Sequence, residues 1–141
     1  REYMQKGFFS KEAGGSLIGK ENKSNENIIS NHITVPMPRD ERKHNRFIRK
    51  DKRHIELFEN LYKKSDETLR YIGEWHTHPE AIPNFSCIDL KNWKKISKDS
   101  KGDVKFYHII VGYEAIRMWE INNTLQVRLI NTVFWKDVGG N

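Results

Sequence analysis

The order of apolar and polar positions along the chain predicts a succession of strands and helices. Runs that alternate apolar with polar residues, or that are rich in β-branched and aromatic residues, are typical of half-buried strands. Such runs lie at residues 14–20, 28–35, 46–49, 69–78, 104–111, 115–121 and 125–133. Polar or glycine-containing turns separate several of them, at residues 22–27, 112–113 and 122–123.

Two other stretches repeat apolar residues at the spacing of a helix. In residues 52–64 the repeating positions are Ile55, Phe58, Leu61 and Tyr62. In residues 86–97 they are Ile88, Trp93 and Ile96. We expect both apolar stripes to face the core, and we expect residues 1–10 to be the end of a further helix. Together the elements predict an α+β fold, a mixed β-sheet flanked by helices, in a single domain that spans residues 1–141.

The composition fits a globular chain of a reducing compartment. Hydrophobic residues make up 36% and charged residues 31% of the 141 residues, and the aromatic residues can bury large areas. No run approaches the length of a membrane-spanning helix, and no secretory leader is visible after Arg1. Cys87 is the single cysteine, which excludes an internal disulfide, and we expect it to be a small buried packing residue. These features predict a cytoplasmic protein without membrane contacts.

Positive charge is concentrated between Met37 and His54. Eight basic and three acidic residues lie there, which gives +5 of the chain's formal net charge of +6. The basic residues are Arg39, Arg42, Lys43, Arg46, Arg49, Lys50, Lys52 and Arg53. Such a segment can bind an acidic protein surface or nucleic acid, or it can simply be solvated. It lacks the interleaved aromatic residues that single-strand binding favours, so we expect contact with a protein rather than with nucleic acid.

The run Glu74-Trp75-His76-Thr77-His78-Pro79 contains the most informative chemical pattern. Side chains alternate along a strand, so His76 and His78 point to the same side. Ser86 is a natural N-cap for a helix that would carry Asp89 back to the strand end. Two imidazoles and a carboxylate leave one tetrahedral position open, as in catalytic zinc sites. Surface histidines beside a capping aspartate, or the two-histidine-one-carboxylate site of an iron oxygenase, would use the same residue types.

A water molecule activated at such a site needs a nearby base, and two glutamates compete for this role. Glu74 shares the strand parity of the two histidines, which slightly favours it on periodicity alone. Glu12 lies far away in the sequence, directly before the small-residue run at residues 14–19. The local pattern by itself leaves both glutamates open.

Three segments, in this order, resemble the JAMM motif of the JAB/MPN metalloproteases. They are residues 12–19 (EAGGSLIG), 76–79 (HTHP) and 86–89 (SCID). The resemblance extends over roughly residues 8–130, nearly the whole chain. It implies the JAB/MPN fold, with a site for one zinc ion per chain at a strand end and the start of a helix.

The resemblance also implies a role for each motif residue. His76, His78 and Asp89 would bind the zinc ion. Glu12 would be the general base and would later protonate the leaving amine. The Ser86 hydroxyl would stabilise the oxyanion of the tetrahedral intermediate, a role that competes with its function as a helix cap.

Other polar residues receive no catalytic role from the resemblance. Glu74 has none in the family, and Thr77 stands where many members have serine and should point away from the metal. The remaining histidines are expected to be structural or surface residues; they are His32, His44, His54 and His108. Residues 139–141 (GGN) look like a modifier tail, but we expect them to be a frayed terminus.

A closer match to one branch of this family is present at residues 12–15, 34–40 and 73–79 and at the pair Asp89 and Trp93. These segments are similar to the bacterial JAB deconjugases encoded in CBASS anti-phage operons. The resemblance implies an isopeptidase that removes a cGAS/DncV-like nucleotidyltransferase, conjugated through its extended C-terminal tail, from its target, and so opposes an E1/E2-like ligase. The short connection after the metal helix lacks the ubiquitin-gripping insertion of eukaryotic relatives. A non-catalytic JAB scaffold and a RadC-like, DNA-associated JAB protein are the alternatives.

Overall fold

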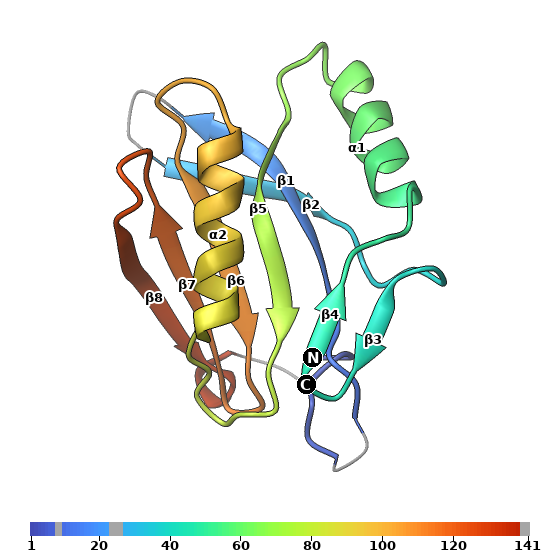
Figure 1. The fold of residues 1–141 in the computed structure, drawn as a ribbon, viewed down its shortest axis with the longest axis vertical. Coiled ribbons are helices and arrows are strands. Elements are labelled where there is room, and N and C mark those ends of the chain that lie inside the picture. Colours follow the sequence, from blue (N-terminus) through green and yellow to red (C-terminus); the bar gives the residue numbers. More distant parts are fainter. Residues whose placement is uncertain (8–9, 23–26, 139–141) are drawn as a thin grey trace.

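The computed structural model describes residues 1–7, 10–22 and 27–138, and Figure 1 shows how its elements are arranged. The strands are β1 (Gly14–Asn22), β2 (Asn27–Ile33), β3 (Glu41–Lys43), β4 (Arg46–Ile48), β5 (Arg70–Thr77), β6 (Phe106–Val111), β7 (Ala115–Ile121) and β8 (Val127–Phe134). The helices are α1 (Arg53–Lys64) and α2 (Cys87–Asp99), and a 3₁₀ turn, Trp135–Asp137, follows β8. β3 has no counterpart in the predicted pattern. The expected frayed end at residues 139–141 and most of the turn predicted at residues 22–27 lie outside the described residues.

Six of the strands form one mixed sheet in the order β2-β1-β5-β6-β7-β8. β5 and β6 run parallel, with Trp75 opposite Ile109, whereas the other neighbouring strands of this sheet are antiparallel. A parallel pair requires a crossover connection, and α2 provides it. β3 and β4 form a separate two-stranded hairpin. The predicted α+β class, a mixed sheet flanked by helices, is therefore confirmed.

α1 and α2 both lie on one face of the large sheet (Figure 1), and α2 covers the main core. The buried residues of this core are Trp93, Phe106, Ile110, Trp119 and Ile121. Trp93 is only 2% exposed, and Ile96 packs against this core, so two of the three expected core contacts of α2 are confirmed. The expectation for Ile88 is wrong, because this side chain in the first turn of α2 is 72% exposed.

α1 is attached in a different way, and the prediction that its whole apolar stripe faces the core is wrong. Ile55 is 57% exposed and Tyr62 is 36% exposed. His54 is the buried residue of this helix, and its ring nitrogens lie 2.6 Å from Thr34 Oγ1 and 2.6 Å from Asp40 Oδ2. Polar contacts at its first turn thus hold α1 in place. No helix in the described part of the chain is long and apolar enough to span a bilayer.

The opposite face of the sheet carries a second apolar cluster, which the N-terminal segment covers. Its buried residues are Ala13, Leu17, Ile72 and Trp75. Tyr3 packs on Trp75 with ring centroids 5.9 Å apart. The described part of residues 1–10 contains a turn closed by the Met4 N–H and the Arg1 carbonyl (3.1 Å), not the predicted helix. The Gln5 amide of this segment bonds to distant parts of the chain, namely the His44 carbonyl and the Thr77 hydroxyl.

A bulge in β5 sets the side-chain alternation that leads to the motif histidines. Leu17 of β1 pairs with Gly73, but the next β1 residue, Ile18, pairs with Tyr71, so Ile72 is an extra residue. Gly73 has a φ of 151°, and a Cβ atom there would lie 1.5 Å from the Tyr107 carbonyl oxygen. Only glycine fits this close approach. After the bulge, the strand alternates regularly to its end at the candidate site.

Candidate functional site

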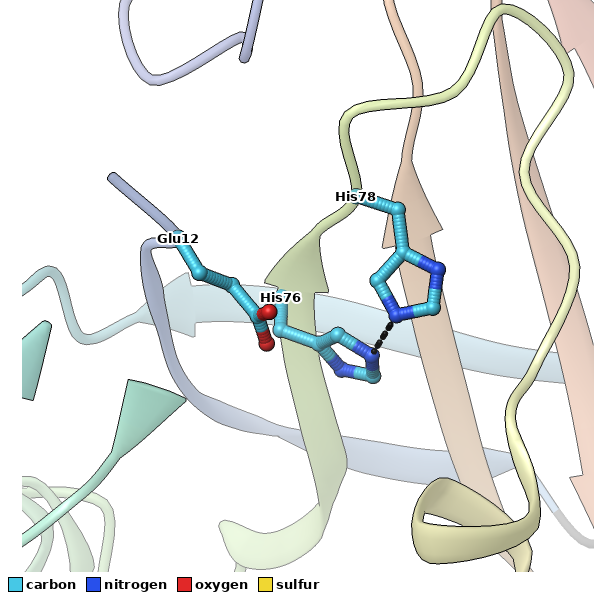
Figure 2. Close-up of side chains that lie close together, drawn as sticks. All are labelled: Glu12, His76 and His78. Carbon is cyan, nitrogen blue, oxygen red and sulfur yellow. Dashed lines mark hydrogen bonds between the residues drawn. The ribbon is translucent and has the colours of Figure 1, made fainter. Parts of the chain in front are cut away.

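Two imidazoles and one carboxylate converge where β5 ends and α2 begins. The Nε2 atoms of His76 and His78 lie 3.1 Å apart, and Figure 2 shows the two rings side by side with these atoms facing each other. Asp89 Oδ1 lies 3.2 Å from His76 Nε2, and Asp89 Oδ2 lies 3.1 Å from His78 Nε2. Ligands bound about 2.0–2.1 Å from a tetrahedral zinc ion are about 3.3 Å apart, so these three side chains fit a single ion.

The first turn of α2 fixes the position of Asp89. Ser86 Oγ accepts a hydrogen bond from the Asp89 N–H (3.1 Å), and Asp89 Oδ2 accepts one from the Ser86 N–H (2.9 Å), which forms a capping box. Burial alone would raise the pKa of Asp89, but hydrogen bonds with His76 and His78 hold this pKa well below its usual range. Capping occupies a lone pair of the Ser86 oxygen and leaves its O–H able to donate, so the cap and an oxyanion role are chemically compatible.

Glu12 lies just before β1, and its side chain extends to the two histidines. Its carboxylate and the ring nitrogens of His76 and His78 all lie within 4.8 Å of one another, and Figure 2 shows its carboxylate beside the ring of His76. The Glu12 residue is only 7% exposed. Burial raises the pKa of Glu12 above its ordinary value, although positive charge on His76 and His78 acts in the opposite direction. A buried carboxylate with a raised pKa beside a metal site suits general-base chemistry.

Glu74, the glutamate that strand parity alone favours, is engaged elsewhere. Its Oε1 lies 3.1 Å from Arg49 Nη2, and Arg49 also donates a hydrogen bond to Ser16 Oγ. Among the described residues, the group that could hold a metal ion contains Glu12 together with the histidines and not Glu74. The local sequence pattern does not choose between the two glutamates, but the structure places Glu12, and not Glu74, beside the two histidines.

Glu80, which the sequence analysis did not single out, contacts the outer nitrogen of His78. Glu80 Oε1 lies 2.8 Å from His78 Nδ1. A carboxylate at Nδ1 fixes the ring orientation, as in many metal sites. It directs Nε2 toward the cluster that Glu12, His76, His78 and Asp89 form. Burial disfavours the charged ring, but hydrogen bonds to Asp89 and Glu80 outweigh it and raise the pKa of His78 to about 9. An acidic residue two positions after His78 is the signal that could have revealed this contact.

The loop of residues 79–85 is anchored to the turn between β6 and β7. The Tyr113 N–H donates to the Glu80 carbonyl at 3.0 Å. Gly112 makes this close approach possible, since a Cβ atom there would lie 2.6 Å from the carbonyl oxygens of both Glu80 and Ala81. The connection between the histidines and α2 is therefore held on the sheet.

An open groove of about 770 Å³ runs beside the cluster. The hairpin of β3 and β4 and the start of α2 line it; the lining side chains outside the cluster are Lys43, Asn45, Arg46, Phe47, Pro79, Ser86, Ile88 and Asn92. Cys87 is exposed, so the prediction that it is a buried packing residue is wrong. The reason lies in the first turn of α2, where Ser86 and Asp89 occupy the inner side and leave the intervening positions outside.

The basic segment predicted between Met37 and His54 is partly neutralised. Ion pairs of 2.6–3.1 Å join Arg53 to Asp51, Lys50 to Glu41 and Arg49 to Glu74. Lys43 and Arg46 line the groove, and Lys43 Nζ also lies 3.7 Å from Glu41 Oε1. Two basic side chains of the segment, Lys43 and Arg46, therefore lie next to the cluster.

The remaining histidines lie outside the cluster. His32 and His44 are exposed, whereas His54 is 1% and His108 is 0% exposed. His108 stacks on Trp93 with ring centroids 4.6 Å apart and planes at 5°. Burial lowers the pKa of His108 to about 3, so this ring is neutral and packs against α2 as an apolar surface would.

A mixed sheet carries two imidazoles and a carboxylate at the junction of a strand and a helix, with a buried glutamate beside them, and this arrangement is compatible with a bound metal ion. Residues 4–122 match the family described as prokaryotic homologs of the JAB domain. The chain belongs to this family, and the JAB fold implied by the sequence resemblance is confirmed.

Three similar proteins bear the name CD-NTase/cGAS isopeptidase. The protein of Escherichia coli (strain TW11681) is 37% identical over 91 residues, which cover 64% of this chain and 57% of that protein. The protein of Pseudomonas aeruginosa (strain BWHPSA011 / Pa011) is 33% identical over 116 residues, 82% of this chain and 72% of that protein. The protein of Vibrio cholerae serotype O1 is 31% identical over 93 residues, 66% of this chain and 58% of that protein. The chain thus matches between 57% and 72% of the length of these relatives, which fall in the isopeptidase branch that it resembles.

Proposed function

We propose that this chain is a zinc-dependent isopeptidase whose activity resides in one domain, residues 1–141. The observation that carries the proposal is the convergence of His76, His78 and Asp89 at 3.1–3.2 Å, with Glu12 beside them. Two imidazole nitrogens and a carboxylate oxygen form a ligand set that zinc accepts in catalytic sites, where one position stays open. The names of the relatives support hydrolysis of an isopeptide bond.

In this proposal His76, His78 and Asp89 hold one zinc ion, which when bound acts as a Lewis acid and makes water more acidic. Glu12 accepts a proton from the water as the water oxygen bonds to the carbonyl carbon of the scissile amide. The Ser86 O–H donates a hydrogen bond to the carbonyl oxygen as negative charge develops there. Glu12 then gives the proton to the amide nitrogen and the C–N bond breaks, which leaves a carboxylic acid on one product and an amine on the other; the acid then loses its remaining proton to solvent.

The proposed substrate is a protein conjugated to its target through an extended C-terminal tail, and the groove supports this choice. The groove is open and borders the cluster, so an extended chain can lie in it. Phe47 and Ile88 offer apolar contacts, while Lys43 and Arg46 can attract an acidic tail. Since the relatives are named for CD-NTase and cGAS, we propose a cGAS-like nucleotidyltransferase as the conjugated protein. Such a cytoplasmic enzyme would oppose an E1/E2-like ligase in anti-phage defence.

The basic segment supports a nucleic-acid partner less well than a protein partner. Arg53, Lys50 and Arg49 are each within ion-pair distance of a carboxylate, so they are not presented to phosphates as an unopposed stripe. A RadC-like, DNA-associated function would require binding that weakens steeply with salt. A protein substrate held in the groove would depend on salt less strongly.

The proposal is tested with a fusion of a CD-NTase C-terminus to a reporter protein. Wild-type protein loaded with zinc should cleave at the junction, and a chelator should stop cleavage. Glu12→Gln keeps the shape of the side chain but cannot take up a proton, so it should retain one zinc ion per chain and lose about 10²–10⁴-fold in turnover. Glu74→Gln is the matched control. It makes the same change at the other candidate base, which pairs with Arg49 and lies outside the cluster.

The outcomes separate the remaining alternatives. Normal turnover of Glu12→Gln would overturn the assignment of the base. Zinc at one ion per chain without cleavage would keep the metal site and exclude this tail as the substrate. A protein that binds no zinc, and binds a partner equally well after Asp89→Ala, would instead be a non-catalytic scaffold.

A further inference from the structure

Gln5 is a buried polar residue that no motif contains. It is 1% exposed, although it lies in the N-terminal segment and is 72 positions away from its partner Thr77. Its Nε2 donates to the carbonyl oxygen of His44 at 2.7 Å, and its Oε1 accepts a hydrogen bond from the Thr77 hydroxyl at 2.8 Å. A carbonyl oxygen can only accept, so the amide orientation is determined by its partners.

Thr77, the residue between the two motif histidines, connects Gln5 by hydrogen bonds to the segment that carries Glu12. Its Oγ1 accepts a hydrogen bond from the Ala13 N–H at 2.9 Å, and its own N–H donates to the Ala13 carbonyl at 2.8 Å. Thr77 is 0% exposed and points away from the cluster, as the alternation of side chains along the strand predicts. The residue that follows Glu12 is thus joined to the residue between His76 and His78.

The hairpin of β3 and β4 holds Glu12 from the other side. The Glu12 N–H donates to the Lys43 carbonyl at 2.7 Å, and the Glu12 carbonyl accepts from Arg42 Nε at 3.0 Å. His44, whose carbonyl receives the Gln5 amide, is the next residue of the same hairpin. Gln5 therefore closes a ring of hydrogen bonds that runs through the hairpin, the backbone of Glu12 and Ala13, and the end of β5.

We propose that Gln5 is a positioning residue that acts through Thr77 and the hairpin to fix Glu12 relative to His76 and His78. It touches neither the cluster nor the groove, and its effect on chemistry would come from the placement of the base. A base displaced by a fraction of an ångström transfers a proton less efficiently, whereas substrate contacts in the groove are unaffected. This inference rests on the proposed isopeptidase function, but the ring of hydrogen bonds can be tested without it.

Hydrogen exchange in the metal-free protein tests the ring directly. Thr77→Val keeps the branched shape and removes the hydroxyl, whereas Thr77→Ser keeps the hydroxyl. The Ala13 amide, which bonds to that hydroxyl, should exchange at least about tenfold faster in Thr77→Val than in wild type, and near the wild-type rate in Thr77→Ser. The Ile110 amide in the centre of the sheet should be unchanged in both. Equal protection of Ala13 in the two variants would overturn the proposal.

Kinetics with the fusion substrate then test the consequence for the base. Thr77→Val and Gln5→Met should each lower kcat by about 10- to 100-fold, with KM and zinc content within twofold of wild type. Thr77→Ser should restore kcat. Ile121→Val, which loosens the core far from the site, is the control for a general loss of stability and should not change kcat at a temperature where the protein is folded.

Failure of this inference and failure of the proposed function give different results. If wild type cleaves and Thr77→Val cleaves as fast as Thr77→Ser, the positioning role is overturned and the isopeptidase stands. If wild type does not cleave, the proposed function fails, and the hydrogen-exchange comparison, extended to Gln5→Met, still decides whether Gln5 and Thr77 hold the Glu12 segment.

Discussion

α1 and α2 lie on the same face of the sheet, but different forces attach them. α2 buries Trp93 against the sheet, where its ring contacts His108, Phe85 and Trp119 at centroid distances of 4.6–5.7 Å. α1 buries no large apolar side chain completely, and its one buried residue, His54, is hydrogen-bonded to other elements. α2 is therefore fixed by packing along its length, whereas α1 is fixed at its first turn.

The difference in attachment matches the residues that each helix contributes to the candidate site. α2 presents Asp89 to the histidines of β5, so a small rotation of α2 would separate the candidate metal ligands. Trp93 lies one helical turn after Asp89, and its packing therefore restrains the same side of the helix. α1 contributes no residue to the cluster among the described residues, and looser attachment there costs the site little. Stability and site geometry should respond to changes in α2 more than to changes in α1.

The largest difference should appear when each helix loses an aromatic side chain. Trp93→Ala removes a fully packed ring and leaves a cavity, so it should lower the free energy of unfolding by about 3–5 kcal/mol. Phe58→Ala on α1 removes a partly exposed ring and should cost only about 1–2 kcal/mol. Urea unfolding at neutral pH measures both. Equal losses in the two variants would contradict the contrast between the helices.

The polar attachment of α1 is tested through Asp40, whose side chain is fully buried beside His54. Asp40 Oδ1 accepts hydrogen bonds from the Lys50 and Asp51 N–H groups, and Oδ2 accepts from the Met37 N–H. Asp40→Asn turns one acceptor into a donor that faces other donors, so it should cost about 2–3 kcal/mol in the free energy of unfolding. Urea unfolding at pH 6 measures this loss.

The free energies of unfolding of wild type and Asp40→Asn should become more similar at low pH. Burial alone would raise the pKa of Asp40, but hydrogen bonds from the Asp51 backbone, His54 and the Met37 backbone lower it below its ordinary value. A lowered folded-state pKa contributes stability that is present above the unfolded-state pKa of about 4 and is lost as pH falls through the folded-state value. The difference between wild type and Asp40→Asn should thus shrink from pH 6 to pH 3. A difference that does not depend on pH would contradict this account.

Glu80, in the loop between β5 and α2, tests whether the surroundings of the cluster favour a metal ion while those of α1 do not. Glu80→Gln keeps an acceptor near His78 Nδ1 but removes its charge, so zinc affinity should fall about tenfold, or about 1.4 kcal/mol. Competition with a chelator of known affinity measures the change. Glu56→Gln, in the first turn of α1, is the matched control and should bind zinc as wild type does. A similar loss in both variants would show a general effect of net charge.

The sequence predicts the strands and the cluster well because both follow from local rules. Alternation gives the strands, and the spacing of His76, His78 and Asp89 needs only a strand end and a capped helix to bring them together. Apolar periodicity identifies one side of a helix but not whether anything covers it, which is why the exposure of Ile55 and Ile88 was not foreseen. Gln5 was missed for another reason, since its contact with Thr77 spans 72 positions and leaves no local pattern.

The smallest stability effects should come from the exposed apolar residues of the two helices. Because stability hardly changes, these residues can be used to compare how the two helices contribute to substrate binding. Ile55→Gln on α1 and Ile88→Gln on α2 replace side chains that are 57% and 72% exposed, so each should change the free energy of unfolding by less than about 0.5 kcal/mol. Ile88 lines the groove, and its replacement should raise KM for the fusion substrate several-fold. Ile55 lies away from that groove, and its replacement should leave KM unchanged. A raised KM for Ile55→Gln at full stability would show that the conjugated protein also rests on α1, which would give α1 a role in binding that its attachment does not suggest.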